Sequence, residues 1–149
     1  MSIAEFCNRE VVCTTRATTV LEAASLMRRH HVGDIVIVDE DGDRRWPIGI
    51  VTDRDIVVEV VAAGLDPSLV KLADLMLEPL TIVERHVGFA QTIRIMAQKG
   101  VRRMPVVDAQ GALLGIVTLD DLLAHLAPPL ADLGELVGQT RQREMQKRK

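Results

Sequence analysis

Two Thr-x-x-Asp pairs are the residues of this chain whose types and spacing best suit ligand binding. They are Thr52 with Asp55 and Thr118 with Asp121, and each pair follows a short apolar run. A threonine hydroxyl beside the free amides of a helix start can contact a phosphate, and an aspartate one turn later offers two acceptor oxygens to a sugar diol. The same spacing is close to a capping box, in which both side chains satisfy only their own helix. One pair alone favours capping, whereas the doubled context favours a ligand role.

Both pairs lie within a duplicated sequence. The matching segments are 32–39 with 101–108, and 49–55 with 115–121. The first pair of segments is offset by 69 residues and the second by 66, so three residues are missing between them in the second copy. Length differences of this kind belong in hairpin turns. Two equivalent sites facing each other are typical of a binding architecture rather than a single catalytic centre.

The elements that position these pairs repeat in the order strand, helix, strand, strand, helix. In the first copy Thr19 and Glu22 have capping-box spacing and predict a helix running towards His31. The second copy predicts a helix over 89–99. The expected strands are 11–13, 35–38 and 48–51, then 80–83, 105–107 and 114–117.

One segment, 56–61, is rich in β-branched residues and would be assigned to a strand in isolation. We predict a helix instead, because its counterpart 122–126 is a good helix former and Gly64 stands where a left-handed residue would end the helix. A helix that is apolar on nearly every side must be covered on two sides. We therefore expect a homodimer in which these helices pack against a partner subunit.

Composition favours one compact cytoplasmic protein. The chain has 149 residues, 48% of them hydrophobic and 26% charged. No apolar run approaches the roughly 20 residues of a membrane span, and we expect neither a signal peptide nor a membrane contact. Cys7 and Cys13 are too few and wrongly spaced for a disulfide framework or a zinc site.

An enzyme and a nucleic-acid binder are the two rival classes. The four histidines have no metal-ligand spacing, and the chain has no G-x-S-x-G, Walker or G-x-G-x-x-G motif, so we expect no catalytic residues, metal or catalytic cofactor. Residues 141–149 hold five basic side chains against one glutamate, but the net charge is −3 and only 2% of residues are aromatic. Nucleic-acid binding is therefore not expected. The tail is interpreted as a solvated helix end that could still bind an acidic partner.

Taken together, the doubled motifs resemble a tandem pair of cystathionine β-synthase (CBS) domains. The resemblance implies an α/β (α+β) fold of two β-α-β-β-α repeats, packed about a pseudo-two-fold axis as a Bateman module. It also implies clefts for AMP, ADP, ATP, S-adenosylmethionine or NAD, and frequent dimerisation. We expect repeats over 8–66 and 74–128, followed by a basic, helical or disordered tail over 129–149.

The resemblance also assigns roles to further residues. Arg102 and Arg103 stand where similar family members contact phosphates, whereas the first copy has Gly33 and Asp34 in their place. An aspartate would repel a phosphate, so we expect unequal clefts. Residues near the adenine ring would be Ile35 and Met104, with Cys13 and Ile82 as further candidates, although core packing is the favoured alternative for each taken singly.

The predicted function is a regulatory sensor of adenine nucleotides that couples occupancy to its own dimer geometry or to an effector protein. The alternatives are a structural or scaffolding homodimer with vestigial sites, or a protein that binds a partner through its basic tail.

Overall fold

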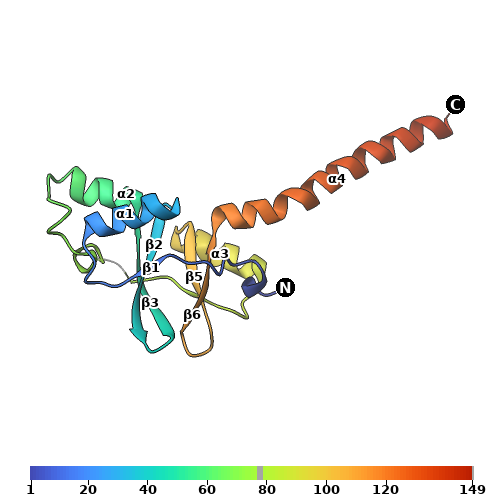
Figure 1. The fold of residues 1–149 in the computed structure, drawn as a ribbon. Helices are drawn as coiled ribbons and strands as arrows, with labels where there is room; N and C mark the ends of the chain where they lie inside the picture. The colour runs from blue at the N-terminus through green and yellow to red at the C-terminus, as the bar shows by residue number, and fades with distance from the viewer. Residues whose placement is uncertain (77–78, 149) are drawn as a thin grey trace.

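The computed structural model describes residues 1–76 and 79–148 and contains two similar α/β units. Each unit has a three-stranded mixed sheet and two helices, and the two sheets lie next to each other (Figure 1). This arrangement confirms the predicted fold class of two repeats.

The first repeat has strand order β1-β2-β3, with β1 parallel to β2 and β2 antiparallel to β3. Its strands are β1 (Cys13–Thr14), β2 (Asp34–Asp41) and β3 (Arg44–Thr52). Its helices are α1 (Val20–His30) and α2 (Asp53–Ile56), and α2 continues as a π-helical turn, η2 (Val57–Val61).

The second repeat has the same topology, with order β4-β5-β6. Its strands are β4 (Val83–Glu84), β5 (Arg103–Val107) and β6 (Leu113–Thr118). Its helices are α3 (Phe89–Lys99) and α4 (Leu119–Lys147). The extra residues of the first copy lengthen its strands and not its turn, because the turn of the first hairpin is 42–43 and that of the second is 108–112. The turns contain Gly42 and Gly111 with positive φ.

Local signals in the sequence account for the helix boundaries. At the start of α1 the Thr19 hydroxyl accepts from the Glu22 amide at 3.2 Å, and the Glu22 carboxylate accepts from the Thr19 amide at 2.8 Å. The contested segment 56–61 is helical, and Gly64 has φ +69°. Both predictions are confirmed. The segment is helical despite its β propensity because the helix buries Ile56 and Val60 in the core of the first repeat.

Each repeat has its own core, and a third cluster joins the sheets. Ile35 and Ile37 of β2 pack with Val20 and Met27 of α1, and Met104 and Val106 play the same part in the second repeat. The third cluster places Val36 and Val38 of β2 against Ile116 of β6. Since these valines face away from α1 and towards the other sheet, β2 is buried on both faces.

The repeats exchange short helical turns near their amino ends. The turn η1 (Ile3–Glu5) precedes the first repeat but packs on the second, where Ile3 is fully buried and its amide donates to the Val87 carbonyl at 2.8 Å. The turn η3 (Leu72–Leu75) packs in the core of the first repeat. The expected repeats, 8–66 and 74–128, leave Ile3 and Leu72 out. Because each turn completes the other repeat, neither repeat is structurally independent.

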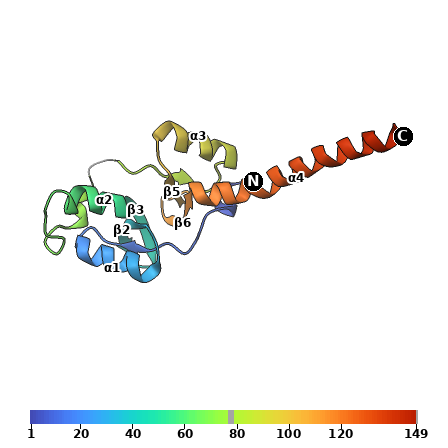
Figure 2. The same ribbon diagram turned by 90° about the horizontal axis from the view of Figure 1, so that it is seen from above.

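Helix α4 extends well beyond the second repeat, away from both sheets (Figures 1 and 2). The expected tail, 129–149, is helical up to Lys147, and every residue from 127 to 148 is exposed. In the part of the chain that the structure describes, no helix combines the length and the apolar character that crossing a membrane requires.

Candidate functional site

A cavity of about 220 Å³ lies between the two repeats. Its wall comes from the start of β2 on one side, and from β5, β6 and the first turn of α4 on the other. The lining residues are Gly33, Asp34, Arg102, Arg103, Thr118, Leu119 and Asp120. The structure thus brings together three of the predicted site residues, Arg102, Arg103 and Thr118.

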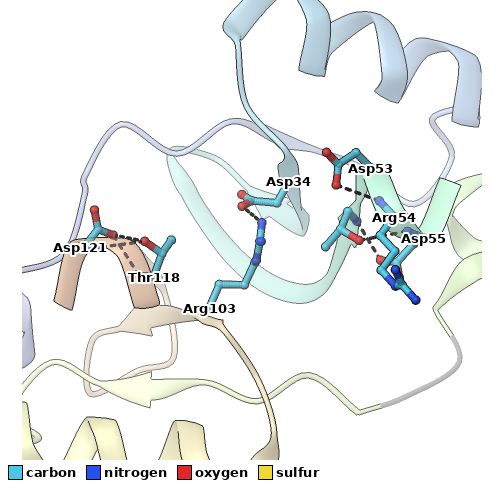
Figure 3. Close-up of polar contacts among 8 residues, drawn as sticks. Asp34, Asp53, Arg54, Asp55, Arg103, Thr118 and Asp121 are labelled. Carbon is cyan, nitrogen blue, oxygen red and sulfur yellow. Dashed lines mark hydrogen bonds and ion pairs between the residues drawn. The ribbon is translucent and has the colours of Figure 1, made fainter. Parts of the chain in front are cut away.

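An ion pair between Asp34 and Arg103 crosses this cavity. Their side chains are 21% and 29% exposed, so the pair is partly shielded from water. Figure 3 shows the carboxylate and the guanidinium pointing at each other from β2 and β5. The two residues lie 69 positions apart and are therefore equivalents in the two repeats. A contact between equivalent residues straddles the pseudo-two-fold axis, so this pair ties the repeats together at their axis.

Arg102 is the freer of the two arginines. It is exposed, and within residues 1–76 and 79–148 it forms no ion pair. Its carbonyl accepts from the Leu119 amide at 2.8 Å, which fixes its backbone at the start of α4. The equivalent carbonyl of Gly33 accepts from the Asp53 amide at 3.0 Å. The two repeats therefore have the same backbone frame at this point, but only the second presents guanidinium groups.

Both Thr-x-x-Asp pairs form capping boxes. The Thr52 amide donates to Asp55 Oδ2 at 2.8 Å, and the Asp55 amide donates to Thr52 Oγ1 at 3.1 Å. Thr118 and Asp121 have the same bonds at 2.9 and 3.2 Å, and the Thr118 hydroxyl donates to Asp121 Oδ2 at 2.7 Å. The capping alternative is therefore realised in both copies. Each box uses Oδ2, and a carboxylate has acceptor capacity beyond that oxygen.

The boxes differ in their relation to the cavity. Thr118 lines it, whereas Thr52 and Asp55 belong to the first repeat's own helix start and Asp121 lies one turn along α4. Figure 3 shows the Asp34–Arg103 pair between the two boxes. The cavity therefore lies at the second box, and unequal ligand binding by the two clefts stays a prediction.

The four residues considered for adenine do not share a surface. Ile35 and Met104 are fully buried in the cores of the two repeats. Cys13 lies half-buried beside the cluster between the sheets, and this burial raises the pKa of its thiol. Ile82 is 43% exposed just before β4. None of the four is among the residues that line the cavity, so their contact with a base stays a prediction.

A second ion pair joins the repeats at the far end of the hairpins. Arg44, at the start of β3, contacts Asp108 at 2.8 Å just after β5. The backbone N–H of Ala112 is the largest of the interactions that hold the pKa of Asp108 below its usual value. Sequence reasoning missed both cross-repeat pairs, because opposite charges separated by more than 60 residues carry no periodic signal.

Comparison with protein families identifies both repeats. The model of the CBS domain matches residues 3–62 and 72–128. The two matches start at Ile3 and Leu72, and so they include the exchanged turns.

Two curated relatives match most of the chain. Uncharacterized protein MK0525 of Methanopyrus kandleri is 40% identical over 83% of this chain and 61% of its own length. Hypoxic response protein 1 of Mycobacterium tuberculosis is 36% identical over 80% of both chains. The chain thus spans less than two thirds of the first relative and four fifths of the second.

Solved structures share the fold. A hexameric CBS-CP12 protein from bloom-forming cyanobacteria has a TM-score of 0.71 at 31% identity, over 83% of this chain and 69% of that one. The cytosolic domain of the Mg²⁺ channel MgtE, in complex with ATP, has a TM-score of 0.66 at 30% identity, over 79% and 46% of the two chains. The CBS domain protein PAE2072 from Pyrobaculum aerophilum, complexed with AMP, has a TM-score of 0.73 at 23% identity over 86% and 99%, which is a likeness of fold.

Proposed function

Because this chain belongs to the CBS domain family, we propose that the cavity between its repeats binds an adenine nucleotide and that the protein is a regulatory module without catalytic activity. The observation that carries the proposal is the convergence of Arg102, Arg103 and Thr118 on one cavity at the repeat interface. The MgtE domain, 30% identical, was solved in complex with ATP, which supports a nucleotide as the class of ligand.

The chemistry of the cavity suits a phosphate group. Arg102 is free of ion pairs among the described residues and can donate two parallel hydrogen bonds to phosphate oxygens. Thr118 adds a hydroxyl at the start of a long helix, where the backbone dipole favours negative charge. A ligand without phosphate, such as S-adenosylmethionine, would leave both guanidinium groups without this partner. We therefore expect AMP, ADP, ATP or NAD to bind more tightly.

The cavity is large enough for only part of a nucleotide. At about 220 Å³ it is smaller than the roughly 300–1,000 Å³ of typical ligand pockets. The phosphate and the ribose fit within the polar wall, whereas the base needs space beyond the residues that line the cavity. Binding of the whole nucleotide therefore requires the repeats to separate at this end.

The Asp34–Arg103 pair supplies the coupling step. A phosphate and the Asp34 carboxylate compete for the guanidinium of Arg103. A bound nucleotide therefore weakens the ion pair that joins the repeats at the pseudo-two-fold axis. The Arg44–Asp108 pair at the other end of the hairpins is untouched by this competition. The repeats would then open about the Arg44 end, and the ligand shifts the population between a tied and an open arrangement.

A partner subunit would respond to this change in the arrangement of the repeats. Val57, Val58 and Val61 of η2 are 56%, 46% and 64% exposed, which supports the predicted homodimer through this helical face. Since these valines follow α2 directly, a rotation of the first repeat would move the interface.

Isothermal titration calorimetry tests the proposal with AMP, ATP, NAD and S-adenosylmethionine. The variants are Arg102→Ala and, as a matched control, Arg94→Ala, which removes an exposed arginine from α3. We expect at least one phosphate-bearing ligand to bind below about 1 mM and Arg102→Ala to weaken it about tenfold, with Arg94→Ala unchanged. If no ligand binds below about 1 mM, the completed capping boxes point to the scaffolding function instead.

A further inference from the structure

The projecting part of α4, residues 127–148, is an exposed helix with a weak backbone. Pro128 and Pro129 lack the amides that would bond to the carbonyls one turn earlier, and Gly134 and Gly138 are poor helix formers. A helix of this length and composition is stabilised mainly by contacts along an apolar face. The prolines mark the point at which such contacts with the second repeat end, because Leu126 is the last residue that is not exposed.

An apolar stripe runs along this helix, and none of residues 1–76 and 79–148 covers it. Leu130, Leu133 and Val137 follow each other at intervals of three and four residues and are 64%, 59% and 71% exposed. The stripe continues the face of Leu122 and Leu126, which packs on the second repeat. One continuous apolar surface is therefore covered at Leu122 and open from Leu130 to Val137.

The covered end of this surface opens into an apolar groove between α3 and α4. The groove has a volume of about 360 Å³ and is lined by Ile93, Met96 and Ala97 of α3 and by Leu122, Leu123 and Leu126 of α4, among others. An apolar groove that continues into an apolar stripe fits a second helix lying along both.

Charge identifies the helix that fits. Asp120, Asp132 and Glu135 make the first part of α4 acidic, whereas its last turns carry Arg141, Arg143, Lys147 and Arg148. Two copies side by side in parallel would place the basic turns against each other. Two antiparallel copies place the basic turns of each beside the acidic part of the other, and the same contact is made twice.

We propose that α4 pairs with α4 of a second copy in antiparallel orientation, with the stripes of Leu130, Leu133 and Val137 in contact. The interface closes on itself as a two-fold dimer. It is distinct from the η2 face and does not depend on nucleotide binding. If both interfaces form, the chain assembles beyond a dimer.

Sedimentation equilibrium of the full chain measures this association. The variant Leu133→Lys with Val137→Lys places two charges in the stripe, and the control Ala131→Lys with Gln142→Lys adds the same charges on the opposite side of the helix. We expect the stripe variant to have half the mass of the wild type and the control to keep the full mass. Equal masses of the wild type and the folded stripe variant, with folding checked by circular dichroism, would overturn the proposal.

Orientation is measured separately by electron spin resonance. A spin label on Gln146→Cys, in a Cys7→Ser, Cys13→Ser background, reports the distance between the two helix ends. With a rise of 1.5 Å per residue and the stripes in contact, antiparallel pairing separates the labels by roughly 35–40 Å, and parallel pairing by roughly 10 Å. A short distance, or no dipolar coupling between labels, would overturn the antiparallel dimer.

Discussion

Asp34 and Arg103 occupy equivalent positions in the two repeats and form an ion pair with each other. In a duplicated chain, a residue near the pseudo-two-fold axis faces its own copy. Two arginines or two aspartates at this position would repel, so the contact is attractive only because the copies differ in charge. The same difference makes one cleft basic and leaves the other with a carboxylate. The difference in charge between Asp34 and Arg103 therefore explains both why the two clefts differ and how the repeats are held together.

Replacing Asp34 by asparagine should strengthen phosphate binding. The change removes the carboxylate that competes for Arg103 and a negative charge from the cavity wall. A gain of about 1 kcal/mol, roughly fivefold in affinity for AMP or ATP, is expected in calorimetry.

Asp39→Asn is the matched control for this change. Asp39 pairs with Arg16 at 2.9 Å on the surface of the first repeat and does not line the cavity. Its affinity should equal that of the wild type. Weaker binding by Asp34→Asn would show that Asp34 takes part in holding the ligand instead of competing with it.

Asp121→Ala and Asp55→Ala separate the capping role from the ligand role. Each removes the acceptor of one capping box, so each should lower the free energy of unfolding by about 1 kcal/mol in urea denaturation. Only Asp121→Ala should also weaken nucleotide binding, because its box holds Thr118 at the cavity. If neither substitution changes affinity, both boxes serve the helices alone.

Much of the fold follows from the sequence because the signals are local. The capping boxes at Thr19 and Thr118, and the left-handed Gly64, depend on residues within one turn of each other. The duplication then carries each assignment from one copy to the other. The conformation is kept even where the residues differ, as at the ends of α1 and α3, where His31 has φ 54° and its equivalent, Gly100, has φ 65°.

The site was predictable in its residues but not in its contacts. Arg102, Arg103 and Thr118 meet as expected, whereas the pairing of Arg103 with Asp34 depends on how the sheets of the two repeats lie against each other. The exchanged turns at Ile3 and Leu72 are similar: their 69-residue offset was present in the sequence, but nothing local shows which repeat each turn joins.

Gly115→Ala tests the exchange of the amino-terminal turn. A Cβ at Gly115 would lie 2.7 Å from the Asn8 carbonyl oxygen and from Cys7 Sγ, and the Asn8 backbone bonds to Ile116 on both sides, at 2.8 and 2.9 Å. We expect a loss of about 1–3 kcal/mol in the free energy of unfolding.

Gly49→Ala is the matched control at the equivalent position of the first repeat. There the nearest atom, at 3.0 Å, is the terminal methyl of Met76, which can rotate away. Its loss of stability in the same denaturation experiment should be smaller. Equal losses would mean that the segment before β1 does not press on β6.

Glu22→Gln should reduce the acid sensitivity of the fold. The backbone N–H of Thr19, and then its hydroxyl, hold the pKa of Glu22 below the ordinary value of 4.5. Because the folded pKa is lowered, the stabilisation is complete above pH 4.5 and is lost as the pH falls through the folded pKa. Melting temperatures measured from pH 6 to pH 3 should therefore converge for the wild type and Glu22→Gln at the acid end. Thr19→Ala, which keeps the backbone donor but loses the hydroxyl, should retain part of the pH dependence. If the difference in melting temperature between the wild type and Glu22→Gln stayed constant with pH, the ionised carboxylate of Glu22 would not be the group that stabilises the helix cap.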